Sequence, residues 1–193
     1  MKYIFLIFFV LVACEKKYPI EVQQKISNEL VTILPSLKNP LLKDSVVISL
    51  PIEFEIKPNL SFRYVGWHYK VDGKTLNDNN FDYQVYNKQN KMETIYQLDF
   101  DKRFEEKLIN IILKERNHLI SKKDAQELLK KYNINKSLDD LKFRDTIKLT
   151  TYINFRNQNK SFINELNKIN DTIMFRVMKD DGSFLYIDKK INW

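Results

Sequence analysis

Glycine, histidine and cysteine are scarce in this chain of 193 residues. The three glycines, Gly66, Gly73 and Gly182, cannot form the glycine-rich loops that bind phosphates or dinucleotides. Two histidines and a single cysteine exclude histidine- or cysteine-rich metal sites and disulfide scaffolds, so we expect neither a metal nor a cofactor. No Gly-x-Ser-x-Gly, Ser-x-x-Lys or His-Glu-x-x-His sequence occurs, so these hydrolase motifs are absent as well.

What is present is typical of a folded protein. Hydrophobic residues make up 44% of the chain and charged residues 30%, which excludes intrinsic disorder, a collagen-like fibre and a polytopic membrane protein. The length is sufficient for one sizeable core or two small ones.

Residues 1–13 are typical of a secretion signal rather than of the fold. After Lys2, the eleven apolar residues Tyr3–Ala13 would rise about 16 Å as a helix, well short of the ~30 Å core of a bilayer. The run ends in Leu11-Val12-Ala13-Cys14, which resembles the lipobox of bacterial lipoproteins. The resemblance implies cleavage before Cys14 and lipidation of that cysteine, and hence membrane anchoring. The alternative, an ordinary signal peptide, would leave a reactive free thiol in an oxidising compartment.

The residues after the cysteine bear on the membrane face. Surface-exported lipoproteins of the Bacteroidetes type usually carry several acidic residues there, whereas Glu15-Lys16-Lys17 contains one. We therefore expect a lipid-anchored protein of the cell envelope, in the outer membrane and facing the periplasm, followed by a tether over residues 14–19.

The positive charge has no concentrated patch. Removal of residues 1–13 takes away Lys2 alone, so 31 basic and 25 acidic residues remain, a net charge of +6. Acidic and basic residues are interleaved, and no run exceeds two lysines. This pattern favours an ordinary solvated surface with weak attraction to a membrane, and we expect no nucleic-acid partner.

The first part of the chain, residues 20–118, is expected to contain a helix, a β-meander and a second helix. A first helix, over about 20–34, is predicted by apolar residues at helical spacing, namely Val22, Ile26, Leu30, Ile33 and Leu37. Alternating apolar residues predict four antiparallel strands over about 46–56, 60–71, 82–87 and 93–100, with a bulge near Gly66. The second helix is predicted by a stripe of apolar residues, namely Phe104, Leu108, Ile111, Ile112 and Leu119.

Residues 119–193 are expected to form an αβ(α)ββ half. Ser121-Lys122-Lys123-Asp124 resembles a capping box before a helix over about 125–132. A strand over 147–155, a brief helix over 162–169 and a hairpin of 173–177 with 184–187 follow. The sequence thus predicts an α+β fold, with antiparallel sheet packed against two or three amphipathic helices. This is either one mixed domain or two halves that meet near residue 119.

The second half resembles a PepSY-type envelope module. The resemblance rests on the helix Ile120–Lys131, on Phe175-Arg176-Val177, and on a hairpin that ends at Asp188. It departs from the family after Asp188, where Lys189-Lys190 replace an expected glycine. The resemblance implies a small non-catalytic envelope domain of a kind proposed to restrain peptidases.

Aromatic residues around His68 are the candidate binding residues. Tyr64, Trp67, His68 and Tyr69, preceded by Phe62, could form a platform for a sugar or a peptide. The alternative is that the aromatic residues are core. As a general base His68 lacks a recognisable partner, and His118, expected near a helix C-terminus, is explained by the helix dipole.

Catalysis is the rival interpretation. Carboxylates on or after strands, namely Glu53, Glu55, Asp99 and Asp101, are of the type that glycosidases use in pairs. Their alternation with apolar residues favours solvent-facing positions instead.

Three Asp-Ser/Thr-aliphatic sequences resemble the acceptor of Bacteroidetes O-glycosylation, with Ser45, Thr146 and Thr172 as the acceptors. The alternative is that each is a polar turn before an apolar strand. Taken together, the sequence predicts a non-catalytic binding or accessory lipoprotein whose partner is another envelope protein or a secreted toxin, as for an immunity protein. A hydrolase acting on peptidoglycan or glycans is the alternative.

Overall fold

Antiparallel β-sheet makes up most of the fold in the computed structural model, which describes residues 18–36, 44–77, 82–100, 108–142 and 144–193. Three short helices lie between the strands. The predicted α+β class is therefore confirmed in its coarse form.

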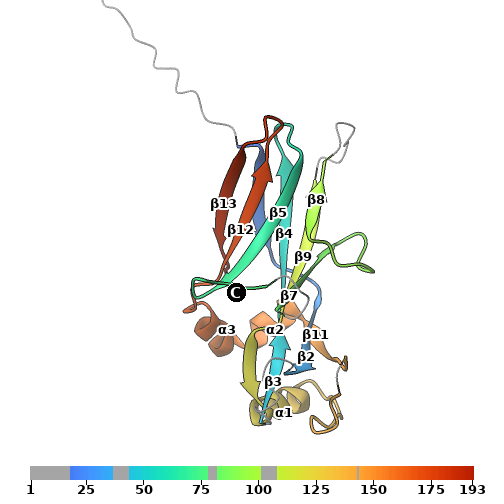
Figure 1. The fold of residues 1–193 in the computed structure, drawn as a ribbon. Coiled ribbons are helices and arrows are strands. Elements are labelled where there is room, and N and C mark those ends of the chain that lie inside the picture. Colours follow the sequence, from blue (N-terminus) through green and yellow to red (C-terminus); the bar gives the residue numbers. More distant parts are fainter. Residues whose placement is uncertain (1–17, 37–43, 78–81, 101–107, 143) are drawn as a thin grey trace, which may run out of the picture.

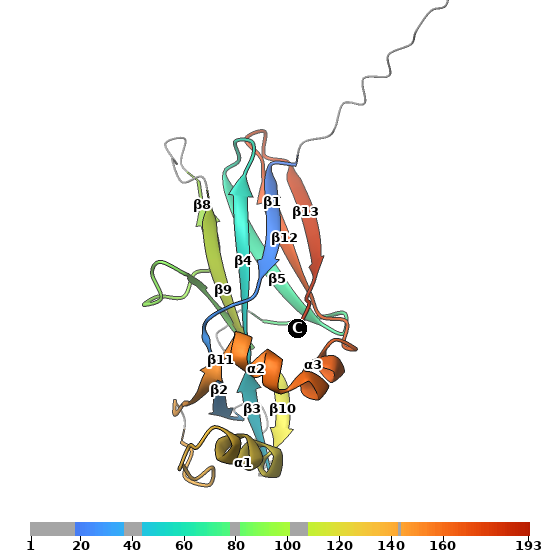
Figure 2. The same ribbon diagram turned by 180° about the vertical axis from the view of Figure 1, so that it is seen from behind.

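Two of the sheets face each other as a sandwich, as the views from opposite sides show (Figures 1 and 2). Sheet A contains, in spatial order, β1 (Ile20–Lys25), β4 (Pro51–Pro58), β9 (Ile109–Glu115) and β7 (Tyr83–Asn87). Sheet C contains β13 (Phe184–Lys190), β12 (Thr172–Met178), β5 (Tyr64–Val71) and, both on the far edge of β5, β6 (Lys74–Thr75) and β8 (Gln97–Asp99). Between the sheets, the rings of Phe54 and Phe175 meet edge to face with centroids 5.5 Å apart.

Sheet A continues into a third sheet at its lower end (Figure 1). Sheet B contains β10 (His118–Ser121), β3 (Ser45–Ser49), β2 (Leu30–Pro35) and β11 (Ile147–Thr151). Only Leu50 separates β3 from β4, and two residues separate β9 from β10. Because the neighbouring strands keep the same order in both sheets, the chain passes from sheet A to sheet B as a bent ribbon.

The three helices pack against these sheets. α1 (Lys122–Lys131) covers one face of sheet B, where Ala125 and Leu129 pack in a small core with Ile33 and Val46. α2 (Tyr152–Gln158) and α3 (Lys160–Leu166) contribute to the larger core between sheets A and C. Among the described residues, no helix has the length and apolar character needed to cross a membrane.

Both helices predicted in the first part of the chain are wrong where the structure describes them. Residues 20–35 form β1 and β2, and Ile26, in the predicted helical stripe, is 51% exposed. Residues 109–121 form β9 and β10, with Ile109, Ile111 and Leu113 buried at the period of a strand. Helix and strand patterns compete in short apolar segments rich in isoleucine, and here pairing with β4 and β3 selects the strand.

The predicted meander is also wrong in its pairing. β4 and β5 follow each other in the chain but lie in opposite sheets, β4 between β1 and β9 and β5 beside β12. No bulge occurs at Gly66, because β5 pairs with β12 without interruption from Tyr64 to Lys70. Without a bulge, side chains of β5 alternate between its two faces, so Tyr64 and Trp67 lie on opposite faces.

The second half agrees better with its prediction. α1, α3 and the β12–β13 hairpin are confirmed, while the predicted strand over 147–155 ends at Thr151, whose side chain caps α2. β12 lies between β13 and β5, so sheet C contains strands from both sides of residue 119.

Candidate functional site

The outer face of sheet C carries four rows of side chains that the strand register sets across β5, β12 and β13. In order along the sheet, the rows are Tyr64, Met178 and Phe184; Gly66, Arg176 and Tyr186; His68, Met174 and Asp188; and Lys70, Thr172 and Lys190. The alternate residues of these strands point into the sandwich, as Trp67 and Phe175 do.

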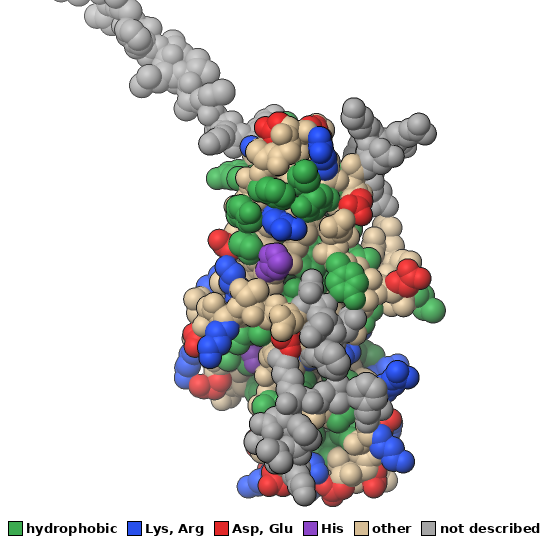
Figure 3. Space-filling view, in the orientation of Figure 1, with side chains coloured by type: hydrophobic (Ala, Val, Ile, Leu, Met, Phe, Trp, Pro, Cys, Tyr) green, Lys and Arg blue, Asp and Glu red, His purple; other side chains and the backbone are tan. Residues whose placement is uncertain are grey.

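Aromatic and apolar side chains make up much of the first two rows. Phe184 is 42% and Tyr186 54% exposed, and their rings stack with centroids 6.4 Å apart. Tyr64 meets Phe184 at 6.2 Å. Figure 3 shows hydrophobic side chains gathered on the upper part of this face around a basic side chain and a histidine. Isolated exposed apolar residues need no explanation, but a contiguous aromatic patch indicates an interaction surface.

Arg176 lies in the middle of this aromatic patch. Its guanidinium carbon is 5.3 Å from the centre of the Phe184 ring and 5.7 Å from that of Tyr64, within the range of cation–π contacts. Its Nε is buried without a hydrogen-bond partner, and no residue in the described ranges forms an ion pair with it. We call Tyr64, Arg176, Phe184 and Tyr186 the Arg176 face.

The outer face of sheet A, on the opposite side of the sandwich, differs in kind. There Lys25 lies 3.4 Å from Glu55, and Lys88 lies 2.7 Å from Glu53. These four charges of sheet A thus neutralise each other within the chain, while Lys114 on the same face lies 5.2 Å from the centre of the Tyr86 ring. The arginine at the centre of sheet C has no such partner.

The four candidate binding residues from the sequence are divided between two faces. Tyr64 and His68 lie on the outer face of sheet C, half-buried, whereas Trp67 and Tyr69 are buried between the sheets. They do not form one platform, because β5 continues without a bulge and its side chains alternate. Phe62 is buried as well, in contact with the ring of Phe100.

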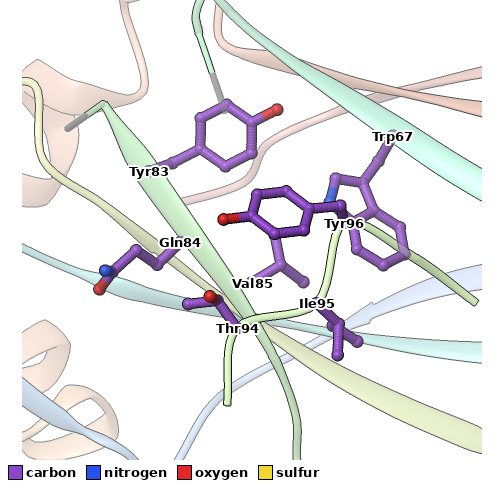
Figure 4. Close-up of a pocket in the computed structure, with 7 residues that line it drawn as sticks. All are labelled: Trp67, Tyr83, Gln84, Val85, Thr94, Ile95 and Tyr96. Atoms are coloured by element: carbon purple, nitrogen blue, oxygen red, sulfur yellow. The ribbon is translucent and has the colours of Figure 1, made fainter. Parts of the chain in front are cut away.

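Trp67 lines a small pocket of about 180 Å³ at the junction of β5, β7 and the segment before β8 (Figure 4). The other lining residues are Tyr83, Gln84, Val85, Thr94, Ile95 and Tyr96. This volume includes open solvent, and the enclosed part has no room for a water molecule. Since pockets for small-molecule ligands commonly enclose ~300–1,000 Å³, this pocket is too small to be the main binding site.

A buried polar cluster lies where sheet A turns into sheet B. Nε2 of His118 is 3.8 Å from Oε1 of Glu115 and 3.7 Å from Oδ2 of Asp171. Both carboxylates are fully buried, and His118 is 8% exposed. Trp193 donates its indole N–H to Oδ2 of Asp171 at 3.0 Å, and the backbone N–H of Asn117 donates to Oε2 of Glu115 at 2.7 Å.

Burial shifts the pKa of each ionisable group in this cluster. It raises the pKa of Glu115 to about 8, with Asp171 adding to the effect. It also raises the pKa of Asp171 and lowers that of His118, although each of these two partly offsets the shift of the other. Desolvation raises the pKa of Tyr69, which packs against the cluster, well above its usual value. Such a group of acids and an imidazole resembles catalytic machinery, but no substrate reaches two fully buried carboxylates.

The remaining carboxylates predicted as catalytic candidates do not come together. Glu53 and Glu55 lie in sheet A, and Asp99 lies on β8 in sheet C, where it accepts a hydrogen bond from Gln97. Asp101 lies outside the described residues. Within the described ranges, no group of three or more His, Cys, Asp or Glu side chains is placed to hold a metal ion.

The predicted modification sites differ in access. Thr146 is exposed, Ser45 is half-buried at the start of β3, and Thr172 is half-buried beside the fully buried Asp171. Cys14, the predicted lipidation site, lies outside the described residues. The helix of the PepSY-like segment packs on sheet B, and the hairpin belongs to sheet C; the resemblance itself stays a prediction.

Sequence reasoning missed Arg176, Phe184 and Tyr186 as site residues. The signal was the alternation within the predicted hairpin, where Phe184 and Tyr186 occupy the positions opposite in parity to the buried face. It missed the buried cluster because His118 was placed at the end of a helix rather than in β10.

Comparison with known proteins gives no further assignment. No protein-family model, no curated protein and no solved structure matches this chain.

Proposed function

We propose that this chain is a lipid-anchored protein of the bacterial cell envelope that acts by binding another protein and catalyses no reaction. An accessory envelope factor and an inhibitor of the immunity type, which would block a secreted toxin, both fit this proposal. The observation that carries it is the Arg176 face, an exposed aromatic patch with an arginine that has no partner within the described residues. Aromatic residues and arginine are enriched at protein–protein interfaces.

The anchoring part rests on Leu11-Val12-Ala13-Cys14 and the apolar run before it. Metabolic labelling with a palmitate analogue followed by membrane fractionation tests it. We expect label on the wild-type chain in the outer-membrane fraction, and no label on Cys14→Ala. A C14A chain that still takes up label would contradict lipidation at this residue.

The binding part is tested by capture of the lipidated wild-type protein from detergent extracts of its own envelope, with quantitative mass spectrometry. Tyr186→Ala removes a ring from the Arg176 face, and Tyr86→Ala is the control on the outer face of sheet A. We expect a co-purifying protein that is depleted by Y186A and retained by Y86A. Equal recovery with both variants would show that binding does not use this face.

The hypothesis that the chain is an immunity protein needs a separate test. Cells that express the chain should survive a periplasm-targeted toxin encoded beside it, and cells that express Y186A should not. Growth arrest in both cases would leave only the accessory version.

The alternative is a periplasmic hydrolase of peptidoglycan or glycans, and the cluster of Glu115, His118 and Asp171 is the observation in its favour. Its full burial argues against it. Release of soluble fragments from peptidoglycan by the wild-type chain, lost in Asp171→Asn, would favour the hydrolase over the binding protein.

A further inference from the structure

We infer that the Arg176 face recognises a protein partner through an aspartate or glutamate carboxylate set among apolar side chains. This inference rests on the proposed binding function and names the chemistry of the partner. The carboxylate would bind the Arg176 guanidinium, while the apolar side chains around it would cover Tyr64, Phe184 and Tyr186.

The state of the guanidinium is the first argument. Two other cationic groups of the sandwich have acceptors within the chain: Arg63 donates to the backbone oxygen of Asp180 at 2.8 Å, and Lys88 pairs with Glu53. Arg176 is half-buried and contacts two aromatic rings, yet its N–H donors have no acceptor among the described residues. A partly desolvated arginine without an anion is unfavourable in the free protein, and a carboxylate from outside supplies the missing acceptors.

The aromatic contacts also prepare the arginine for binding. Stacking against Tyr64 and Phe184 restricts the side chain before any partner arrives, so less conformational entropy is lost when a carboxylate binds it. The planar guanidinium can then donate two parallel hydrogen bonds to one carboxylate.

Space beside the arginine is the second argument. Gly66 lies directly across from Arg176 in the strand register, and a Cβ atom there would meet nothing within 4 Å. The glycine is itself buried between Arg176 on β12 and Gln97 on β8, and it leaves open space next to the guanidinium. In this proposal, the carboxylate-bearing side chain of the partner would enter that space.

The composition of the face favours a protein over other anionic partners. Phenylalanine, tyrosine and arginine, the residue types of this face, are enriched in protein interfaces. An anionic membrane surface is bound by clusters of lysine and arginine, whereas the centre of this face has a single cation. A second copy of the chain, docked symmetrically on the same face, would bring a second unpaired arginine into the interface.

The experiment is site-specific photo-crosslinking in the native envelope. A benzoylphenylalanine at position 186 keeps an aromatic group on the face, and one at position 86 is the control on sheet A. The crosslinked segment is identified by mass spectrometry, and Arg176→Gln, Arg176→Lys and Gly66→Leu are made in the position-186 background. Thermal unfolding of each variant confirms that it folds.

We expect position 186 to crosslink to a protein segment that contains an aspartate or glutamate between apolar residues. Position 86 should give no crosslink to the same segment. Arg176→Gln should lower the yield about tenfold or more, the usual effect of losing a charge-assisted hydrogen bond. Arg176→Lys should restore it in part. Gly66→Leu should lower the yield with Arg176 intact, because the side chain fills the space beside the guanidinium. A synthetic peptide of the segment should bind the wild-type chain at least tenfold more weakly when its carboxylate is replaced by an amide.

Several results would overturn the inference: a yield that R176Q leaves unchanged, a crosslinked segment without an acidic residue, crosslinks to glycan, lipid or a second copy, or no crosslink from position 186. Capture of a partner by the whole wild-type chain distinguishes failure of this inference from failure of the proposed binding function. If a partner is captured but does not depend on Arg176, the binding function stands and this inference fails. If no partner is captured, both fail.

Discussion

Replacement of Glu115 by glutamine tests whether the buried polar cluster makes the stability of the fold depend on pH. Glutamine has the size of a protonated glutamic acid and keeps an oxygen that can accept the N–H of Asn117, 2.7 Å from Oε2 in the wild type. Its amide nitrogen takes the place of Oε1, which has no hydrogen-bond partner and lies 3.8 Å from Nε2 of His118. The substitution therefore removes the titration with little change in packing.

The sign follows from the direction of the pKa shift. Burial raises the pKa of Glu115 from 4.5 to about 8 in the folded chain, so the folded chain holds a proton that the unfolded chain releases between these values. The stability that this group contributes is fully present below pH 4.5 and is lost as the pH rises towards 8. One proton changes the free energy of unfolding by at most about 1.4 kcal/mol per pH unit. Between pH 5 and pH 8, the wild type should lose roughly 3 kcal/mol relative to Glu115→Gln.

The pKa values of neighbouring groups are shifted as well, in both proteins. Asp171 also has a raised pKa, which destabilises the fold as the pH rises, while the lowered pKa of His118 destabilises it as the pH falls. Tyr69 and Trp193, which contact the cluster, stay neutral in this window. The difference between wild type and variant at each pH removes most of these common contributions.

The assay is urea unfolding of residues 18–193, followed by tryptophan fluorescence at half-unit steps from pH 5 to pH 8. Glu21→Gln, an exposed substitution on β1 with the same change of charge, is the control and should run parallel to the wild type. A difference between wild type and Glu115→Gln that stays constant over this range would refute the reasoning, because it would mean that Glu115 is ionised in the folded chain.

Three further substitutions test the packing. Ser121→Ala removes the side-chain oxygen that accepts the N–H of Asp124 at 3.0 Å and should cost about 1 kcal/mol in urea unfolding, with Ser161→Ala as an exposed control. Leu129→Ala, fully buried between α1 and sheet B, should cost roughly 2–5 kcal/mol; a cost below 1 kcal/mol would place this helix elsewhere. Trp193→Phe removes the indole donor to Asp171 and should lower stability by about 2 kcal/mol at pH 7, whereas an unchanged midpoint would show that the hydrogen bond does not form.

Local sequence signals were sufficient where the chain folds on itself. Ser121 and Asp124 marked the start of α1, and the alternation on either side of the Asp181-Gly182 turn marked the β12–β13 hairpin. These features depend on contacts between residues close in sequence, so a local pattern contains most of the information that determines them.

Local signals failed where the partner of a segment lies far along the chain. Ile109, Ile111, Ile112 and Leu113 suit the buried face of a helix or of a strand, and only the presence of β4 and β7 on both sides decides for the strand. The same holds for β1, whose partner β4 lies about thirty residues away.

The candidate site shows the same division. The pattern around His68 directed attention to β5, and Tyr64 does belong to the Arg176 face. Its other members come from β12 and β13, and the sequence does not show that residues 176 and 66 lie side by side. Nor does it show which charged residue lacks a partner, because ion pairing depends on what the opposing strand presents.

The sequence by itself determined the features that depend on composition and short spacing: the lipobox-like start, the absence of glycine-rich and metal-binding motifs, and the α+β class. The tertiary structure decided which apolar runs became strands, which aromatic residues became core, and that Arg176 remained unpaired at the centre of an exposed aromatic patch. The physical reason is that burial and ion pairing are properties of long-range contacts. In an antiparallel sandwich these contacts form between strands that the sequence places far apart.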